Sequence, residues 1–92
     1  MMSLQQAADW LPGSRLVGSA LITPIRVNTD TRKLRTGDFF VALKGEKFDA
    51  HDFLPQAAAQ GAVAALATHG LAAAGLPGLE VADTRLALGQ LA

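Results

Sequence analysis

Residues 28–53 read NTDTRKLRTGDFFVALKGEKFDAHDF and form the central segment of the sequence. Its centre, FFVAL at 39–43, is a continuous apolar run, which is typical of a strand buried on both faces of an α/β sheet. A polar turn, NTDTR at 28–32, precedes the run, and a charged loop, KGEKFD at 44–49, follows it. Charged residues are concentrated here, so we expect a ligand site in this stretch.

Outside this stretch, strands and helices are predicted in alternation. Ser3 and Gln6 have capping-box spacing and begin a helix over residues 4–11, which Pro12-Gly13 ends and whose Trp10 is expected to pack against the next strand. Further helices are expected between Asp52 and Gly61 and from Thr84, with Asp83 as the cap, and a short helical turn is possible within 69–78. Strands are expected at 15–17, 22–27 (interrupted by Pro24), 39–43, 62–67 and 79–81. This order predicts one α/β domain over residues 1–92, a small mixed β-sheet packed with helices.

The composition excludes several classes of protein. The 92 residues carry a formal net charge of zero, so no overall field attracts nucleic acid. The chain has no cysteine, its first residues lack the pattern of a signal peptide, and its longest apolar run is too interrupted to span a membrane. We therefore expect a soluble, cytoplasmic protein. The last helical pattern has no terminating signal before Ala92, so we expect the chain to be part of a longer protein.

The motifs of common catalytic sites are missing. The sequence contains no GxxxxGK[ST] loop for ATP phosphates, no GxGxxG after a strand, and no HExxH. Its two histidines are not spaced as metal ligands, and no serine lies in a nucleophile motif. We therefore predict a recognition domain with no catalytic residue, no metal and no cofactor of its own.

The two polar segments around the apolar run offer groups that suit a phosphate and a planar ring. Cations are supplied by Arg32, Lys44 and Lys47, backbone amides by the bend at Gly45, and a stacking surface by Phe48. Composition alone favours a plainer interpretation, in which the loop charges are solvated. Asp30 and Arg32 equally suit a structural ion pair, and His51 suits a helix start satisfied by local hydrogen bonds.

Several fixed spacings between residues 30 and 62 agree with one family. The chain has D-T-R at 30–32, G-D-F-F-V-A at 37–42, G-E-K-F-D-A-H-D-F at 45–53 and A-A-A-Q-G-A at 57–62. These motifs resemble the N-terminal domain of the Mur ligases of bacterial cell-wall synthesis. The segment ALKGEKFDAHDF is most similar to the MurF type, which joins D-alanyl-D-alanine to UDP-N-acetylmuramoyl-tripeptide. The resemblance extends over residues 27–92.

The resemblance implies a domain that holds the UDP end of a UDP-N-acetylmuramoyl-peptide. It also implies a central ATPase domain and a C-terminal domain, absent from this chain, with ATP and magnesium bound in the parent enzyme. Thr31 would contact the uracil or ribose, while the backbone from Gly45 through Glu46 to Phe48 would frame the base. Arg32, Lys44 and Lys47 would lie near the diphosphate. Asp30, Asp49 and His51 would shape the turn, the loop and the following helix start.

Two other interpretations remain open at this point. The parent could be of the MurE type, which adds the third residue of the peptide instead of D-alanyl-D-alanine. Alternatively, the chain could be a structural or interaction module whose alanine-rich faces are covered by other domains.

Overall fold

The computed structural model describes residues 2–91 and contains one five-stranded sheet. The strands are β1 (Arg15–Val17), β2 (Arg26–Asn28), β3 (Asp38–Val41), β4 (Ala64–Ala67) and β5 (Gly78–Glu80). Their order across the sheet is β1-β5-β4-β3-β2; the last four are mutually parallel, and β1 pairs antiparallel to β5. The predicted α/β class with a small mixed sheet is confirmed.

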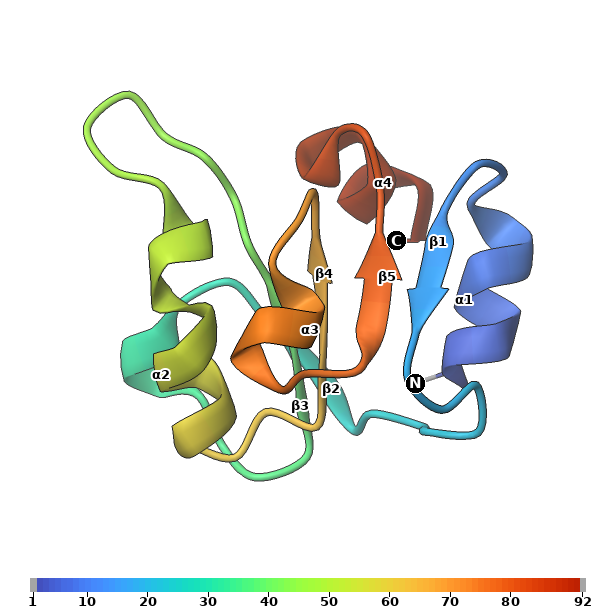
Figure 1. Ribbon diagram of the computed structural model, residues 1–92, viewed down its shortest axis with the longest axis horizontal. Helices are drawn as coiled ribbons and strands as arrows, with labels where there is room; N and C mark the ends of the chain where they lie inside the picture. The colour runs from blue at the N-terminus through green and yellow to red at the C-terminus, as the bar shows by residue number, and fades with distance from the viewer. Residues whose placement is uncertain (1, 92) are drawn as a thin grey trace.

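Four short helices and two 3₁₀ turns pack around the sheet (Figure 1). The helices are α1 (Leu4–Trp10), α2 (Leu54–Ala59), α3 (Leu71–Ala74) and α4 (Thr84–Leu91), and the turns are η1 (Thr31–Lys33) and η2 (Ala50–Phe53). One apolar cluster joins β3 and β4 to α2 and α3, and a second joins the other face of the sheet to α1 and α4. The molecule therefore has three layers.

The apolar run at the centre of the sequence is the middle of this arrangement. Phe39 and Val41 of β3 belong to the cluster under α1 and α4, whereas Phe40 and Ala42 belong to the opposite one. All four are completely buried. The period-two alternation of side chains along a strand thus sends apolar groups into both layers, as the continuous run predicted.

Two strands begin later in the structure than the apolar pattern predicted. The strand expected over 22–27 is regular only from Arg26, because Pro24 interrupts the preceding segment. The strand expected from residue 62 begins at Ala64. The capping box at Ser3 and Gln6 and the Asp83 cap are both present. The prediction that Trp10 packs against the next strand is wrong, since this residue is 64% exposed.

The parallel pairing fixes where the loops lie. Because β2, β3, β4 and β5 run in the same direction, the loops that follow them all emerge at one edge of the sheet. This edge faces the top of Figure 1, where the 44–49 loop and α4 both lie. Ligands of open α/β sheets bind outside the carboxyl ends of the strands. The fold therefore places both polar segments of the sequence at the edge where a ligand site is expected.

Candidate functional site

The turn after β2 and the loop after β3 enclose a cavity, called here the first cavity. Its volume is about 570 Å³. It is lined by Thr29, Asp30, Thr31, Arg32, Phe40, Phe48, Ala50, Phe53 and Gln56. The two segments meet because β2 and β3 are parallel neighbours, with Arg26 opposite Asp38. Sequence alone left this juxtaposition undecided.

The turn that forms one wall is held by its own side chains. Asn28 accepts the backbone N–H of Asp30 and donates to the carbonyl of Lys33. The Asp30 carboxylate accepts the backbone N–H of Arg32, which begins η1. Each of these side chains satisfies a backbone group that the short turn leaves free. The wall is therefore a defined surface rather than an open loop.

Arg32 forms an ion pair within this turn. Its Nε and Nη2 donate to the two oxygens of Asp30 at 3.1 and 3.0 Å. The side-chain hydrogen bond from Arg32 and its backbone amide hold the pKa of Asp30 below its ordinary value. The guanidinium has five N–H donors, so this pairing leaves donors free for a ligand. Its side chain is 85% exposed, which keeps those donors accessible.

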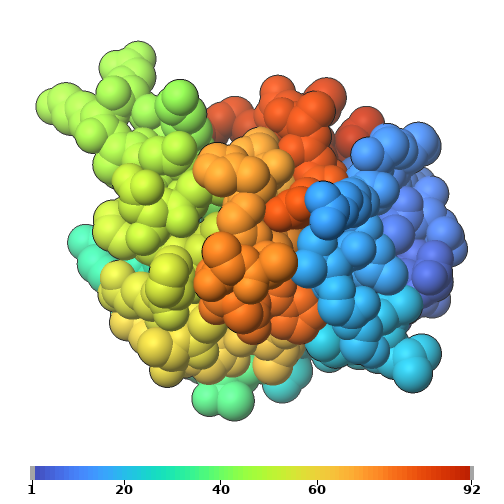
Figure 2. Space-filling view, in the orientation of Figure 1, coloured from blue at the N-terminus to red at the C-terminus, as the bar shows by residue number. Residues whose placement is uncertain are grey.

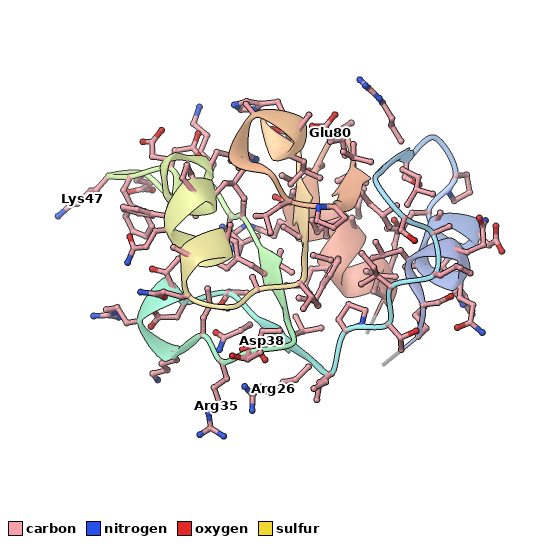
Figure 3. All side chains as sticks on the ribbon, turned by 60° about the horizontal axis from the view of Figure 1, so that its bottom comes forward. Arg26, Arg35, Asp38, Lys47 and Glu80 are labelled. Carbon is pink, nitrogen blue, oxygen red and sulfur yellow. The ribbon has the colours of Figure 1, made fainter. Side chains whose placement is uncertain are left out.

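The opposite wall begins with a hairpin over residues 44–49. Lys44 and Asp49 pair as an antiparallel bridge, and the Gly45 amide donates to the carbonyl of Phe48. The hairpin projects from the body as an arm (Figure 1 and Figure 2). Lys47 lies at the tip and points away from the rest of the molecule (Figure 3). Only Phe48 of this hairpin lines the first cavity.

Two aromatic rings form the apolar part of the first cavity. Phe48 and Phe53 have ring centroids 6.3 Å apart and planes inclined by 51°. They are 63% and 38% exposed, whereas Phe40 behind them is fully buried. Exposed aromatic faces beside hydrogen-bonding groups suit a planar, polar ring. The first cavity can thus stack a heterocycle and meet an anion at Arg32.

The base of the hairpin is tied to the end of β4 through His51. Nδ1 of His51 lies 2.6 Å from Oδ1 of Asp49, and Nε2 accepts the backbone N–H of Thr68 at 2.9 Å. Nε2 is therefore the unprotonated nitrogen, and the proton resides on Nδ1. The His51 backbone amide, together with this ring contact, holds the pKa of Asp49 below its ordinary value. The hydrogen bonds of His51 are thus both local and long-range.

The predicted site residues fall into three groups. Asp30, Thr31, Arg32 and Phe48 line the first cavity. Lys44, Asp49 and His51 line a second cavity, at the ends of β3, β4 and β5. Gly45, Glu46 and Lys47 line neither of these cavities.

Sequence reasoning did not assign to the site four residues of the first cavity that bear functional groups or rings: Thr29, Phe40, Phe53 and Gln56. Phe53 closes the G-x-x-x-D-A-H-x-F motif, and Gln56 lies three residues further along, on α2. The helical spacing between them was the available signal, because residues three apart share a helix face.

Two absences hold for the described part of the chain. No helix within residues 2–91 is long and apolar enough to cross a membrane. No three of its histidine, aspartate and glutamate side chains are grouped to hold a metal ion.

Known proteins resemble this chain in sequence over nearly its whole length. Residues 26–92 match the family described as "Mur ligase family, catalytic domain". The UDP-N-acetylmuramoyl-tripeptide–D-alanyl-D-alanine ligase of Escherichia coli is 54% identical over 91 residues, which cover 99% of this chain and 20% of that protein. The UDP-N-acetylmuramoyl-L-alanyl-D-glutamate–2,6-diaminopimelate ligase of Streptomyces coelicolor is 43% identical over 97% of this chain and 18% of its own length.

A solved structure shows the same fold. The crystal structure of MurF from Acinetobacter baumannii superposes with a TM-score of 0.78 at 41% identity, over 97% of this chain and 20% of that one. The chain thus spans about a fifth of the length of the relatives it matches. The matched family segment contains both polar segments and all of β2 to β5. On this evidence the chain belongs to the Mur ligase family.

Proposed function

We propose that this chain is the nucleotide-recognition domain of a MurF-type ligase, which adds D-alanyl-D-alanine to UDP-N-acetylmuramoyl-tripeptide in the cytoplasm. The observation that carries the proposal is the first cavity, where the Asp30–Arg32 turn faces the Phe48 and Phe53 rings. A uridine nucleotide combines a planar base with an anionic diphosphate, and the first cavity offers a partner for each.

In this proposal each wall takes one part of the ligand. The uracil stacks against Phe48 and Phe53, and the backbone from Gly45 to Phe48 frames its edge. The Thr31 hydroxyl binds the base or ribose. Arg32 meets the diphosphate with the N–H groups that Asp30 leaves free. Because Lys47 points away from the body, it would reach the diphosphate only if the hairpin bends toward the ligand.

The catalytic steps belong to parts of the parent ligase outside these 92 residues. There, ATP with magnesium would transfer a phosphoryl group to the terminal carboxylate of the precursor and leave ADP. The amine of D-alanyl-D-alanine would then attack the acyl phosphate, forming an amide and releasing phosphate. This chain has no GxxxxGK[ST] loop, so its own contribution is to hold the nucleotide end.

The choice of amine substrate rests on similarity. The relative that uses D-alanyl-D-alanine is 54% identical, against 43% for the one that uses 2,6-diaminopimelate. This difference supports a MurF-type parent over a MurE-type one. An assay of the complete ligase with each amine distinguishes a MurF-type from a MurE-type parent, because only one of the two amines should give product.

Titration of the ¹⁵N-labelled chain with UDP tests the recognition role. Amide signals of Thr29 to Arg32, Phe48, Phe53 and Gln56 should move together along one saturable curve. Signals at the far edge of the sheet, such as those of Arg15 and Leu16 in β1, provide the control and should stay in place. If millimolar UDP shifts only scattered surface amides and leaves the first-cavity signals in place, the proposal is contradicted.

A further inference from the structure

The ring of His51 connects the hairpin over residues 44–49 to the end of β4. Only 6% of this side chain is exposed, so both ring nitrogens need partners inside the protein. Nδ1–H donates to Asp49 at 2.6 Å, and Nε2 accepts the backbone N–H of Thr68 at 2.9 Å. Asp49 also accepts the backbone N–H of His51 at 3.0 Å. A backbone group at the end of β4 is thus joined to the base of the hairpin.

The same hairpin base carries the aromatic wall of the first cavity. Phe48 comes directly before Asp49, and its ring meets Phe53, which lies two residues after His51. The rest of the hairpin projects from the body (Figure 1), and Phe48 is 63% exposed. Packing therefore does little to fix the Phe48 ring, whereas the hydrogen bonds of His51 fix the backbone between the two rings.

These hydrogen bonds require a neutral His51. A backbone N–H can only donate, so the Thr68 amide needs the lone pair on Nε2. Because Nδ1 already carries a proton, a second proton would go to Nε2 and place two donors 2.9 Å apart. The Thr68 hydroxyl, 3.0 Å from Nε2, can accept that proton, but the Thr68 amide still loses its acceptor. Protonation of His51 thus breaks the link to β4.

Charges of both signs lie around the ring. The charged and titratable groups come from the hairpin, η2, the loop after β4 and the start of α4: Lys44, Asp49, Asp52, His69, Asp83 and Arg85. Two of the acids and both strong bases line one cavity with His51, so these charges balance. The ring of His69 stacks on that of His51, with centroids 4.7 Å apart, and a charge on it would oppose one on His51. The link to the Thr68 amide is therefore the feature that distinguishes the two forms of His51.

We propose that neutral His51, anchored by the backbone amide of Thr68, is the positioning residue for the Phe48 wall of the first cavity. The inference rests on the proposed nucleotide role of that cavity. A hairpin without this anchor must be ordered by the ligand, and the free energy of ordering is lost from the affinity. Loss of the anchor therefore weakens UDP binding.

Two substitutions at position 51 separate the anchor from the other contacts of the ring. The carboxamide of His51→Gln lies as many bonds from Cβ as Nε2 does, so its oxygen can accept the Thr68 N–H. The shorter side chain of His51→Asn reaches only as far as Nδ1, so it can donate to Asp49 but does not reach Thr68. At about pH 8, His51→Asn should bind UDP roughly 2- to 10-fold more weakly than the wild type, whereas His51→Gln should stay close to it.

A readout without nucleotide keeps this inference apart from the proposed function. Nuclear Overhauser effects between the Phe48 and Phe53 rings should appear in the free wild type and His51→Gln, and be lost in His51→Asn. His69→Gln is the matched control: His69 is exposed, so its replacement should leave these signals and the UDP affinity unchanged. If UDP moves no first-cavity amide in the wild type, the nucleotide role fails, while the ring signals still decide the positioning role.

The pH profile of the wild type tests the protonation step without a substitution in the chain. Histidine changes charge between about pH 5 and 8, whereas glutamine does not titrate. UDP affinity should therefore fall further from about pH 8 to about pH 5 in the wild type than in His51→Gln. Titration of the UDP phosphate is common to both proteins and cancels in the comparison. Equal pH dependence overturns the proposal, and so does a His51→Asn protein that loses stability in urea but keeps its UDP affinity and ring signals.

Discussion

Arg26 holds the carboxylate of Asp38 across the pairing of β2 and β3, with Nη2 2.8 Å and Nε 2.9 Å from Oδ1. Asp38 is completely buried, and its second oxygen accepts the backbone N–H of Arg35 at 2.9 Å. Arg26 and Asp38 are register partners, and Figure 3 shows their side chains together. The contact joins the edge strand to the centre of the sheet. It therefore helps to fix the two strands whose loops form the first cavity.

Replacing Asp38 by alanine should destabilise the fold strongly. The change leaves the Arg26 guanidinium, whose side chain is 39% exposed, and the Arg35 amide without their acceptor. A buried donor left unsatisfied costs about 1–3 kcal/mol. Urea unfolding measures the loss. Asp52→Ala is the control: Asp52 is exposed, so its effect should stay within about 0.5 kcal/mol. Similar losses for the two variants would contradict the role given to Asp38.

Stability should fall in acid because of the same carboxylate. Burial raises the pKa of Asp38, but the Arg35 amide and the Arg26 guanidinium outweigh it and hold the pKa below its ordinary value. A lowered folded-state pKa stabilises the protein above the unfolded value of about 4 and loses that contribution as the pH falls through the folded value. Urea midpoints measured from pH 6 downward should decline below about pH 4. Asp38→Asn should decline less steeply, and parallel curves would refute this assignment.

Gly78 should not accept a side chain. It starts β5 at φ 157°, opposite Ala65 of β4, and an added Cβ would lie 1.8 Å from the Ala65 carbonyl oxygen. That atom is backbone in the middle of the sheet, so Gly78→Ala should cost more than about 4 kcal/mol or prevent folding. Amide signal dispersion and thermal unfolding report the result.

Gly89 provides the matched control for this prediction. It lies within α4 and has open space where a Cβ would be added. Gly89→Ala should stabilise the protein by about 0.5–1 kcal/mol, because alanine is the better helix former. A Gly78→Ala protein as stable as the Gly89→Ala protein would show that β4 and β5 do not pair this closely.

Much of the fold follows from local pattern. FFVAL at 39–43 predicted a strand buried on both faces, and Ser3 with Gln6 predicted the start of α1. These features depend on neighbours in the sequence, which the sequence displays directly. The prediction for Trp10 was wrong because the exposure of this residue depends on how α1 lies against β1. That is a tertiary relationship, which no local sequence pattern encodes.

The site shows the same division. The turn at Asp30 to Arg32 and the hairpin from Lys44 were evident as polar segments, but their meeting depends on β2 and β3 being parallel neighbours. The sequence also did not show that the hairpin residues face different ways. Phe48 lines the first cavity and Lys44 the second, while Lys47 points outward. From composition alone, all three residues were equally good candidates for contacting a ligand.

Phe48 should contribute to nucleotide binding without contributing to stability. It is 63% exposed and touches Phe53 at the mouth of the first cavity, so its truncation removes a stacking surface but no core contact. Loss of one aromatic platform costs about 1–3 kcal/mol per stacked base, so Phe48→Ala should weaken UDP binding roughly 5- to 150-fold in calorimetric or NMR titration. Leu86 has the same exposed fraction, 63%, and does not line the first cavity, so Leu86→Ala should bind UDP as the wild type does. If both substitutions weaken binding alike, the effect comes from the fold and not from stacking on Phe48.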